Sequence, residues 1–169
     1  DNLFEAANGR VEEALHQLLL KTKKKIAFAE SCSGGGLAAK VTALPDSSVY
    51  FLGSLVCYSN TLKTRLLNVS EKTLQEDGAV SKATVDAMLR GLFACSEADY
   101  AIAVSGIAGP KGGSEAKPVG TVWIAVGARD EKPIAQEFHF TGNRFVITET
   151  AINMALGLLW QKIKQDLYV

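Results

Sequence analysis

The stretch that most constrains the fold runs from Ile26 to Leu44. The apolar run "IAFAE" predicts a short buried β-strand over 26–30. Three glycines come soon after it, and "GGGLAAKVTAL" predicts a helix over 34–44 that ends before Pro45. A strand that passes through a tight turn into a helix is expected where helices stack on a sheet.

The same alternation continues along the chain. Helix patterns cover 4–22, 60–68, 70–78 and 82–96, and a helix of about 20 residues starts near Asn143. Asn60 and Ser81 are candidate N-caps. Strand patterns cover 49–59, 99–105, 121–128 and 134–141, and the last two are expected to form a hairpin around 129–133. The predicted fold class is α/β, a single three-layer α/β/α domain over residues 1–169 with a mixed, mostly parallel sheet.

Composition and charge argue against several partners. Lys and Arg number 18, as do Asp and Glu, so a nucleic-acid partner is not expected. No apolar run approaches the roughly 20 residues of a membrane span, so no membrane partner is expected. Cys32, Cys57 and Cys95 are widely spaced, which favours free thiols and a cytoplasmic location. The two histidines lie far apart, so we expect no metal and no other cofactor.

The glycine-rich stretch "ESCSGGG" is a candidate anion site. Backbone N–H groups at the start of a helix bind phosphates or developing oxyanions, and glycines let a ligand approach the backbone. We therefore expect the N–H groups of Ser33, Gly34 and Gly35 to contact substrate. The stretch is neither a Walker A loop nor a G-x-G-x-x-G loop. An ordinary tight turn packed with small residues explains it equally well.

Nucleophile and base candidates follow from the same region. Ser31 lies at the end of a strand, and "YSNTLK" places Tyr58 and Lys63 where a strand gives way to a helix. A buried lysine can act as general base for a serine without a histidine. The alternatives are a solvated lysine and a core tyrosine. Cys32 is a rival nucleophile, although neighbours along a strand point to opposite faces, so Ser31 and Cys32 should not both face the substrate.

A second glycine-rich loop covers 106–120 and also follows a strand. Long loops without apolar periodicity are often functional, although a mobile surface loop remains the alternative. Two such loops at strand ends predict one crevice at the carboxyl edge of the sheet. Ser105, Gly106 and Gly109 are its candidate substrate contacts.

Five stretches, taken together, resemble the CinA C-terminal domain family: "AESCSGGG", "YSNTLK", "GAVS", "SGIAGPKGGSEAKPVGTVW" and "FTGNR". The resemblance covers roughly residues 8–165. It implies hydrolysis of the carboxamide of nicotinamide mononucleotide (NMN) to nicotinate mononucleotide and ammonia, in pyridine-nucleotide recycling. It also implies that Ser31 is the nucleophile, Lys63 its base and Tyr58 their support, and that Ser48 and Arg144 belong to the site.

Three departures from the family pattern remove no proposed catalytic group. Ser33 stands where threonine is common, Cys57 where threonine or alanine is, and a third glycine where a bulkier residue is. We expect an acyl-enzyme mechanism, with Arg144 and the 106–120 loop holding the 5′-phosphate.

Two other functions remain compatible with the sequence. They are a nucleotide-binding or regulatory module without turnover, and an amidohydrolase for a related nucleotide. The apolar segment 49–56 and the "KPVGTVW" segment, a possible sheet edge, favour a homo-oligomer, a dimer or higher, in which Arg144 could reach a neighbour's site.

Overall fold

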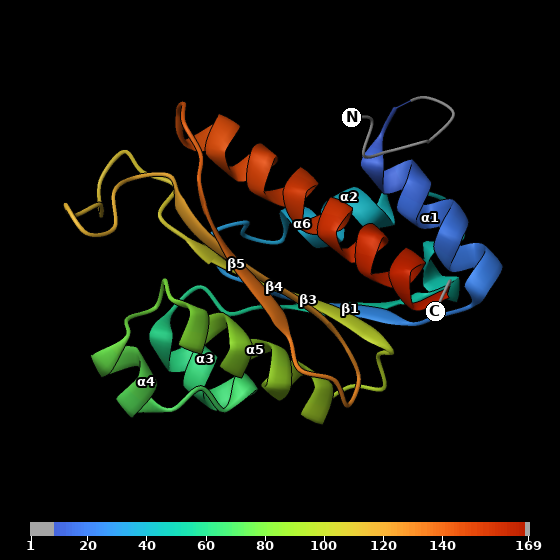
Figure 1. The fold of residues 1–169 in the computed structure, drawn as a ribbon, viewed down its shortest axis with the longest axis horizontal. Helices are drawn as coiled ribbons and strands as arrows, with labels where there is room; N and C mark the ends of the chain where they lie inside the picture. The colour runs from blue at the N-terminus through green and yellow to red at the C-terminus, as the bar shows by residue number, and fades with distance from the viewer. Residues whose placement is uncertain (1–8, 168–169) are drawn as a thin grey trace.

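The protein is built on one five-stranded sheet in the order β2-β1-β3-β4-β5 (Figure 1). The computed structural model describes residues 9–167. The strands are β1 (Ile26–Glu30), β2 (Phe51–Val56), β3 (Tyr100–Gly106), β4 (Thr121–Ala128) and β5 (Ile134–His139). β2, β1 and β3 are parallel, whereas β4 is antiparallel to both of its neighbours, β3 and β5. Only β4 therefore runs against the other strands, and the sheet is mixed and mostly parallel, as predicted.

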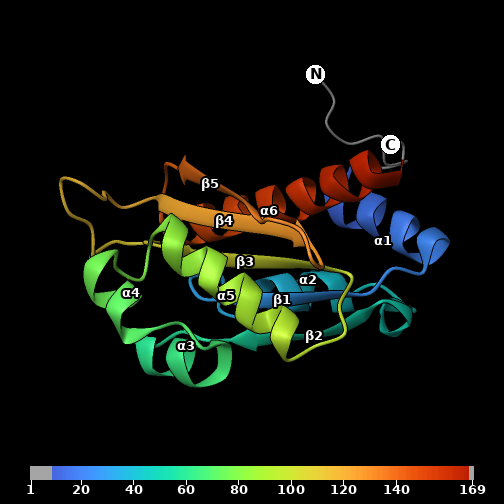
Figure 2. The same ribbon diagram turned by 60° about the horizontal axis from the view of Figure 1, so that its bottom comes forward.

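Helices cover both faces of the sheet, which confirms the predicted three layers. One layer holds α1 (Val11–Thr22), α2 (Gly36–Thr42) and the long α6 (Arg144–Leu167). The other holds α3 (Asn60–Leu67), α4 (Glu71–Glu76) and α5 (Lys82–Ala94). The two views show these layers on opposite sides of the sheet (Figures 1 and 2). That the domain extends over all of residues 1–169 stays a prediction.

Side-chain size alternates along the central strands, and this sets how close each layer lies. Large side chains such as Ile26 and Phe28 pack under α1, α2 and α6. The alternate positions on the face below α5 are largely alanines: Ala27, Ala29, Ala101, Ala103 and Ala125. The α3 and α5 helices also meet closely, since a Cβ atom added to Gly91 would lie 1.9 Å from the carbonyl oxygen of Leu67.

Several predicted boundaries differ from those observed. The helix predicted over 4–22 is observed from Val11, and residues 4–8 lie outside the described part. The strand predicted over 49–59 is shorter because a 3₁₀ turn occupies Ser47–Val49. Asn60 is not an N-cap: Ser59 caps α3 by accepting from the N–H of Leu62. Ser81 caps α5 as predicted.

Within residues 9–167, no helix combines the length and the apolar character that crossing a membrane requires. The same residues contain no cluster of metal-ligating side chains. All three cysteines are free thiols.

Candidate active site

A cavity of about 270 Å³ opens at the carboxyl ends of β1 and β3, close to the lower end of the roughly 300–1,000 Å³ of ligand pockets. The 106–120 loop, the start of α3 and the start of α6 complete it. It brings together seven of the predicted site residues: Ser31, Tyr58, Lys63, Ser105, Gly106, Gly109 and Arg144. The cavity therefore lies at the predicted edge of the sheet, but of the first glycine-rich stretch only Ser31 and Cys32 line it.

Ser31 and Lys63 are in direct contact at the base of this cavity. The Nζ atom of Lys63 lies 3.0 Å from the Oγ atom of Ser31. Both side chains are buried, and Lys63 is only 1% exposed. Burial lowers the pKa of Lys63 below its ordinary value, because the desolvated ammonium form is disfavoured. The solvated-lysine alternative is therefore excluded.

The surroundings of Lys63 suit both of its protonation states. Nζ also donates to the carbonyl oxygens of Cys57 at 2.8 Å and Tyr58 at 3.3 Å. A neutral amine has two N–H bonds and one lone pair, so the two carbonyls occupy its donors and the lone pair remains for the Ser31 hydroxyl. The ammonium form donates to all three oxygens. A proton can thus move between Ser31 and Lys63 without breaking the other contacts.

Cys32 also lines the cavity, so the expectation that it would face away from Ser31 is wrong. The strand ends at Glu30, and strict alternation of side chains ends with it. Burial raises the pKa of the Cys32 thiol to about 12, with smaller opposing effects from Lys63 and Arg144. The thiol is therefore protonated at neutral pH, which makes it a poor nucleophile.

The glycine-rich stretch binds an anion, but that anion is the carboxylate of Glu30. This side chain is fully buried and accepts five hydrogen bonds. Its Oε2 accepts from Ser33 Oγ and from the N–H groups of Gly35 and Leu37, at 2.7 to 3.1 Å. Its Oε1 accepts from the Ala38 N–H at 3.0 Å and from Ser54 Oγ at 2.8 Å.

Substrate contacts predicted at Ser33, Gly34 and Gly35 are therefore not provided by this structure. The Ser33 hydroxyl and the Gly35 N–H are bound to Glu30, and the Gly34 N–H donates to the carbonyl oxygen of Ser31. None of the three residues lines the cavity. Gly34 and Gly35 instead adopt positive φ angles of 59° and 97°, which permit the turn around Glu30.

Arg144, Tyr58 and Gly109 form a linked group at the mouth of the cavity. Arg144 donates from Nη2 to the Tyr58 hydroxyl at 2.8 Å and from Nη1 to the Gly109 carbonyl oxygen at 2.7 Å. Tyr58 is 57% exposed, so it is not a core tyrosine. Both partners of Arg144 are neutral, so its positive charge remains available to an anion.

Ser105 and Gly106 form part of the cavity wall. Ser105 Oγ donates to the carbonyl oxygen of Ala79 at 2.7 Å. A Cβ atom on Gly106 would lie 2.6 Å from Val122 Cγ2 and 3.1 Å from Cys32 Sγ, so no side chain fits there.

Ser48 is exposed and lies away from this cavity. It belongs to the 3₁₀ turn that precedes β2, whereas Tyr58 follows β2. A strand of this length extends roughly 20 Å, so the two residues lie at opposite ends of it. The prediction that Ser48 contacts substrate is wrong for an isolated chain.

Two polar side chains of the cavity were not singled out from the sequence as ligand contacts. Lys111 lies within the predicted glycine-rich loop, and Asn60 was considered only as a helix cap. Neither side chain forms a hydrogen bond or ion pair with another residue of 9–167. Lys63, Lys111 and Arg144 are basic, and no Asp or Glu lines the cavity, so the site favours an anionic ligand.

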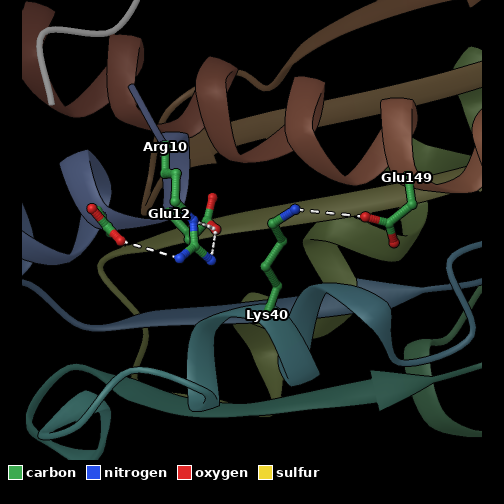
Figure 3. Close-up of polar contacts among 5 residues, drawn as sticks. Arg10, Glu12, Lys40 and Glu149 are labelled. Carbon is green, nitrogen blue, oxygen red and sulfur yellow. Dashed lines mark hydrogen bonds and ion pairs between the residues drawn. The ribbon is translucent and has the colours of Figure 1, made fainter. Parts of the chain in front are cut away.

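Two larger cavities among residues 9–167 lack this combination of groups. One of about 430 Å³ lies between α3 and α4, and it is larger but has no paired nucleophile and base. Another, of about 410 Å³, lies beside the polar residues in Figure 3. There Arg10 pairs with Glu12 at 2.6 Å and Lys40 with Glu149 at 3.6 Å, so these charges compensate one another.

Comparison with known proteins gives consistent results. The model of the CinA C-terminal domain matches residues 8–163. The chain is 47% identical over 164 residues to a CinA-like protein of Endomicrobium trichonymphae. The aligned region covers 96% of this chain and 38% of that protein. It is 40% identical over 157 residues to the nicotinamide-nucleotide amidohydrolase PncC of Escherichia coli K12, covering 93% and 95% of the two chains. This chain spans about two fifths of the length of the CinA-like relatives.

Solved structures show the same fold. A CinA superfamily protein from Klebsiella pneumoniae superposes with a TM-score of 0.88 at 34% identity, covering 92% of this chain and 96% of that one. A competence/damage-inducible protein from Agrobacterium tumefaciens gives a TM-score of 0.86 at 34% identity, covering 91% and 95%.

Proposed function

Because this chain belongs to the CinA C-terminal domain family, we propose that it is an amidohydrolase that converts NMN to nicotinate mononucleotide and ammonia. The observation that carries the proposal is the buried contact of 3.0 Å between Lys63 Nζ and Ser31 Oγ in a cationic cavity. A module that only binds nucleotides has no use for a buried lysine with a lowered pKa beside a serine. The similarity to PncC over nearly both whole chains supports the choice of NMN.

Acylation begins with neutral Lys63. It takes the proton from Ser31 as Oγ attacks the carboxamide carbon of the substrate. The carbon–nitrogen bond of the resulting tetrahedral intermediate then breaks, and the protonated Lys63 returns the proton to the leaving ammonia. Water hydrolyses the acyl-enzyme, with Lys63 again accepting and returning a proton, and this step releases nicotinate mononucleotide.

Stabilisation of the oxyanion needs donors other than those predicted, because the N–H groups of Gly34 and Gly35 already donate elsewhere and Ser33 does not line the cavity. We assign this role to the carboxamide of Asn60, which lines the cavity. Removal of one such donor typically lowers turnover by about 10²–10³-fold.

The cationic side chains at the cavity mouth bind the 5′-phosphate of the substrate. Arg144 presents a planar guanidinium whose hydrogen-bond partners are both neutral, and Lys111 belongs to the 106–120 loop that Arg144 contacts at Gly109. NMN carries a phosphate and nicotinamide riboside does not, so the two substrates separate the contribution of these cations from that of Ser31 and Lys63.

The decisive experiment measures ammonia release from NMN by the purified chain and by Ser31→Ala, Lys63→Ala and Cys32→Ala variants. We expect release by the parent and by Cys32→Ala, and none above background by the other two. Activity that survives Ser31→Ala but not Cys32→Ala would overturn the assignment of the nucleophile. Calorimetric binding of NMN without ammonia release by the parent would instead favour a binding module.

A further inference from the structure

Ser105 lies beside the proposed nucleophile, at the end of the neighbouring strand. β1 and β3 are adjacent parallel strands (Figure 2), and Glu30 and Val104 are the last pair of residues in register. Ser31 and Ser105 directly follow that pair, and the N–H of Ser31 still donates to the carbonyl oxygen of Val104 at 3.0 Å. Adjacent strands are about 4.8 Å apart, so the two serines are next to each other. Both line the cavity, and Ser105 is only 1% exposed.

The hydroxyl of Ser105 has its only proton committed to the protein. Its Oγ donates to the carbonyl oxygen of Ala79 at 2.7 Å, and a carbonyl oxygen cannot donate in return. Rotation of the hydroxyl towards a ligand would leave that carbonyl oxygen without this bond. Ser105 therefore offers a ligand only the lone pairs of Oγ. It is a buried acceptor in a cavity whose cations at the mouth, Lys111 and Arg144, can only donate.

We propose that Ser105 determines the specificity of the site for a carboxamide, because its Oγ accepts a hydrogen bond from the carboxamide N–H of the substrate. The proposal rests on the amide hydrolysis proposed above. Substrate and product of that reaction differ in one group. NMN carries an NH2 group, which donates, where nicotinate mononucleotide carries a carboxylate oxygen, which only accepts. An acceptor held at this position pairs with the amide and opposes the lone pairs of the acid.

The same hydrogen bond orients the leaving group. In the tetrahedral intermediate the nitrogen has two N–H bonds and one lone pair. When one N–H donates to Ser105, the lone pair is left for the proton on Lys63, whose Nζ lies 3.0 Å from Ser31 Oγ. Lys63 transfers its proton to that lone pair, the electron pair of the carbon–nitrogen bond leaves with the nitrogen as ammonia, and the oxyanion re-forms the carbonyl group. The acid formed by hydrolysis has no N–H for Ser105, which favours its release.

Binding of the two nucleotides tests the acceptor without turnover. In a Ser31→Ala background, which leaves NMN intact, calorimetry gives the Kd of NMN and of nicotinate mononucleotide with and without the Ser105→Ala substitution. The cations of the cavity attract both compounds, so the informative quantity is the change in the ratio of the two Kd values. We expect Ser105→Ala to shift this ratio about 10-fold towards the acid, the effect of one lost hydrogen bond. A shift of less than about 2-fold would refute the acceptor role.

Kinetics with two leaving groups test the same bond during turnover. The methyl ester of nicotinate mononucleotide loses methanol, and its leaving oxygen carries no N–H. We expect Ser105→Ala to lower kcat/KM for NMN about 10-fold and to change that for the ester less than about 2-fold. Ser105→Thr, which keeps the hydroxyl, should restore the rate with NMN. Equal losses with both substrates would show that Ser105 only supports the cavity wall.

Ser96→Ala is the matched control. Ser96 Oγ also donates to a backbone carbonyl oxygen, that of Leu92 at 2.7 Å, but it follows the end of α5 that is remote from the cavity. This variant should change neither the Kd ratio nor either rate, and a shift as large as that of Ser105→Ala would refute the assignment. Far-UV circular dichroism verifies that the variants are folded. If the parent releases no ammonia, the proposed function fails, yet the Kd ratio still decides the role of Ser105. A parent that binds neither nucleotide would overturn both.

Discussion

Replacement of Glu30 by glutamine should destabilise the fold strongly, although it changes only one atom. The carboxylate accepts five hydrogen bonds, three at Oε2 and two at Oε1. A glutamine has one acceptor oxygen and one amino group. In its better orientation the oxygen keeps the three bonds at Oε2, and the amino group then faces the Ala38 N–H and the Ser54 hydroxyl. The hydroxyl can rotate to accept, but the N–H cannot.

The magnitude follows from these contacts. One half-buried N–H group loses its acceptor, which costs about 1–3 kcal/mol, and the surviving bonds change from charge-assisted to neutral, at about 0.5–1 kcal/mol each. Burial of a neutral amide in place of a carboxylate offsets part of this loss. We expect a net loss of about 2–4 kcal/mol in the free energy of unfolding, which lowers Tm by roughly 5–15 °C for a chain of this size.

Urea and thermal unfolding of Glu30→Gln would measure this loss. Glu149→Gln is the control, because Glu149 is 43% exposed and its ion pair with Lys40 is a surface contact worth less than about 1 kcal/mol. If Glu30→Gln unfolds within 1 kcal/mol of the parent, the carboxylate does not anchor the turn between β1 and α2, and the glycine-rich stretch would again be free to bind substrate.

Three further predictions concern the site. Gly91→Ala should push α3 away from α5 at Leu67 and move Lys63 off Ser31, so denaturant titration should show a loss of about 1–3 kcal/mol and the ammonia-release rate should fall at least 10-fold. Lys63→Met should abolish activity yet keep or raise Tm near pH 7. Because the pKa of Lys63 is lowered in the folded state, the parent should gain stability as pH rises toward the pKa of an unfolded lysine, and the variant should not. A lower Tm of the variant at every pH would contradict this. Lys111→Glu should raise KM for NMN about 10-fold with little change in kcat, whereas Lys132→Glu, on the β4–β5 turn, should leave both unchanged in steady-state assays.

The order and type of the elements could be predicted because apolar periodicity is a local property of the sequence. The run over 26–30 and the alternating strands after it specify buried strands whatever their partners are. The cap of α3 was misplaced by one residue because Ser59 and Asn60 are both good capping residues. The bounds of β2 were overestimated because its flanking residues are equally apolar.

The candidate site was predictable where the relevant residues lie at the carboxyl ends of neighbouring strands. Ser31, Ser105 and the start of α3 meet for that topological reason. Glu30 was missed because a glutamate next to a turn looks like a surface charge. Only the folded structure surrounds it with five donors, four from the turn and the start of α2 and one, Ser54, from β2. Ser48 could not be placed because it lies at the amino end of a strand, and nothing local to the sequence reports which end of β2 adjoins the cavity.

The alternation of large and small side chains in the sheet also bears on how such a chain can evolve. Under α6, a change in the size of a large side chain such as Ile26 or Phe28 can be compensated by a substitution at a neighbouring large side chain, so the sequence can vary there. The alanines on the other face are already small and cannot compensate a larger neighbour by shrinking, and Gly91 cannot acquire a side chain without displacing α3. Mutational latitude is therefore concentrated in one helical layer, and the layer that holds Lys63 is the one that selection must keep nearly fixed.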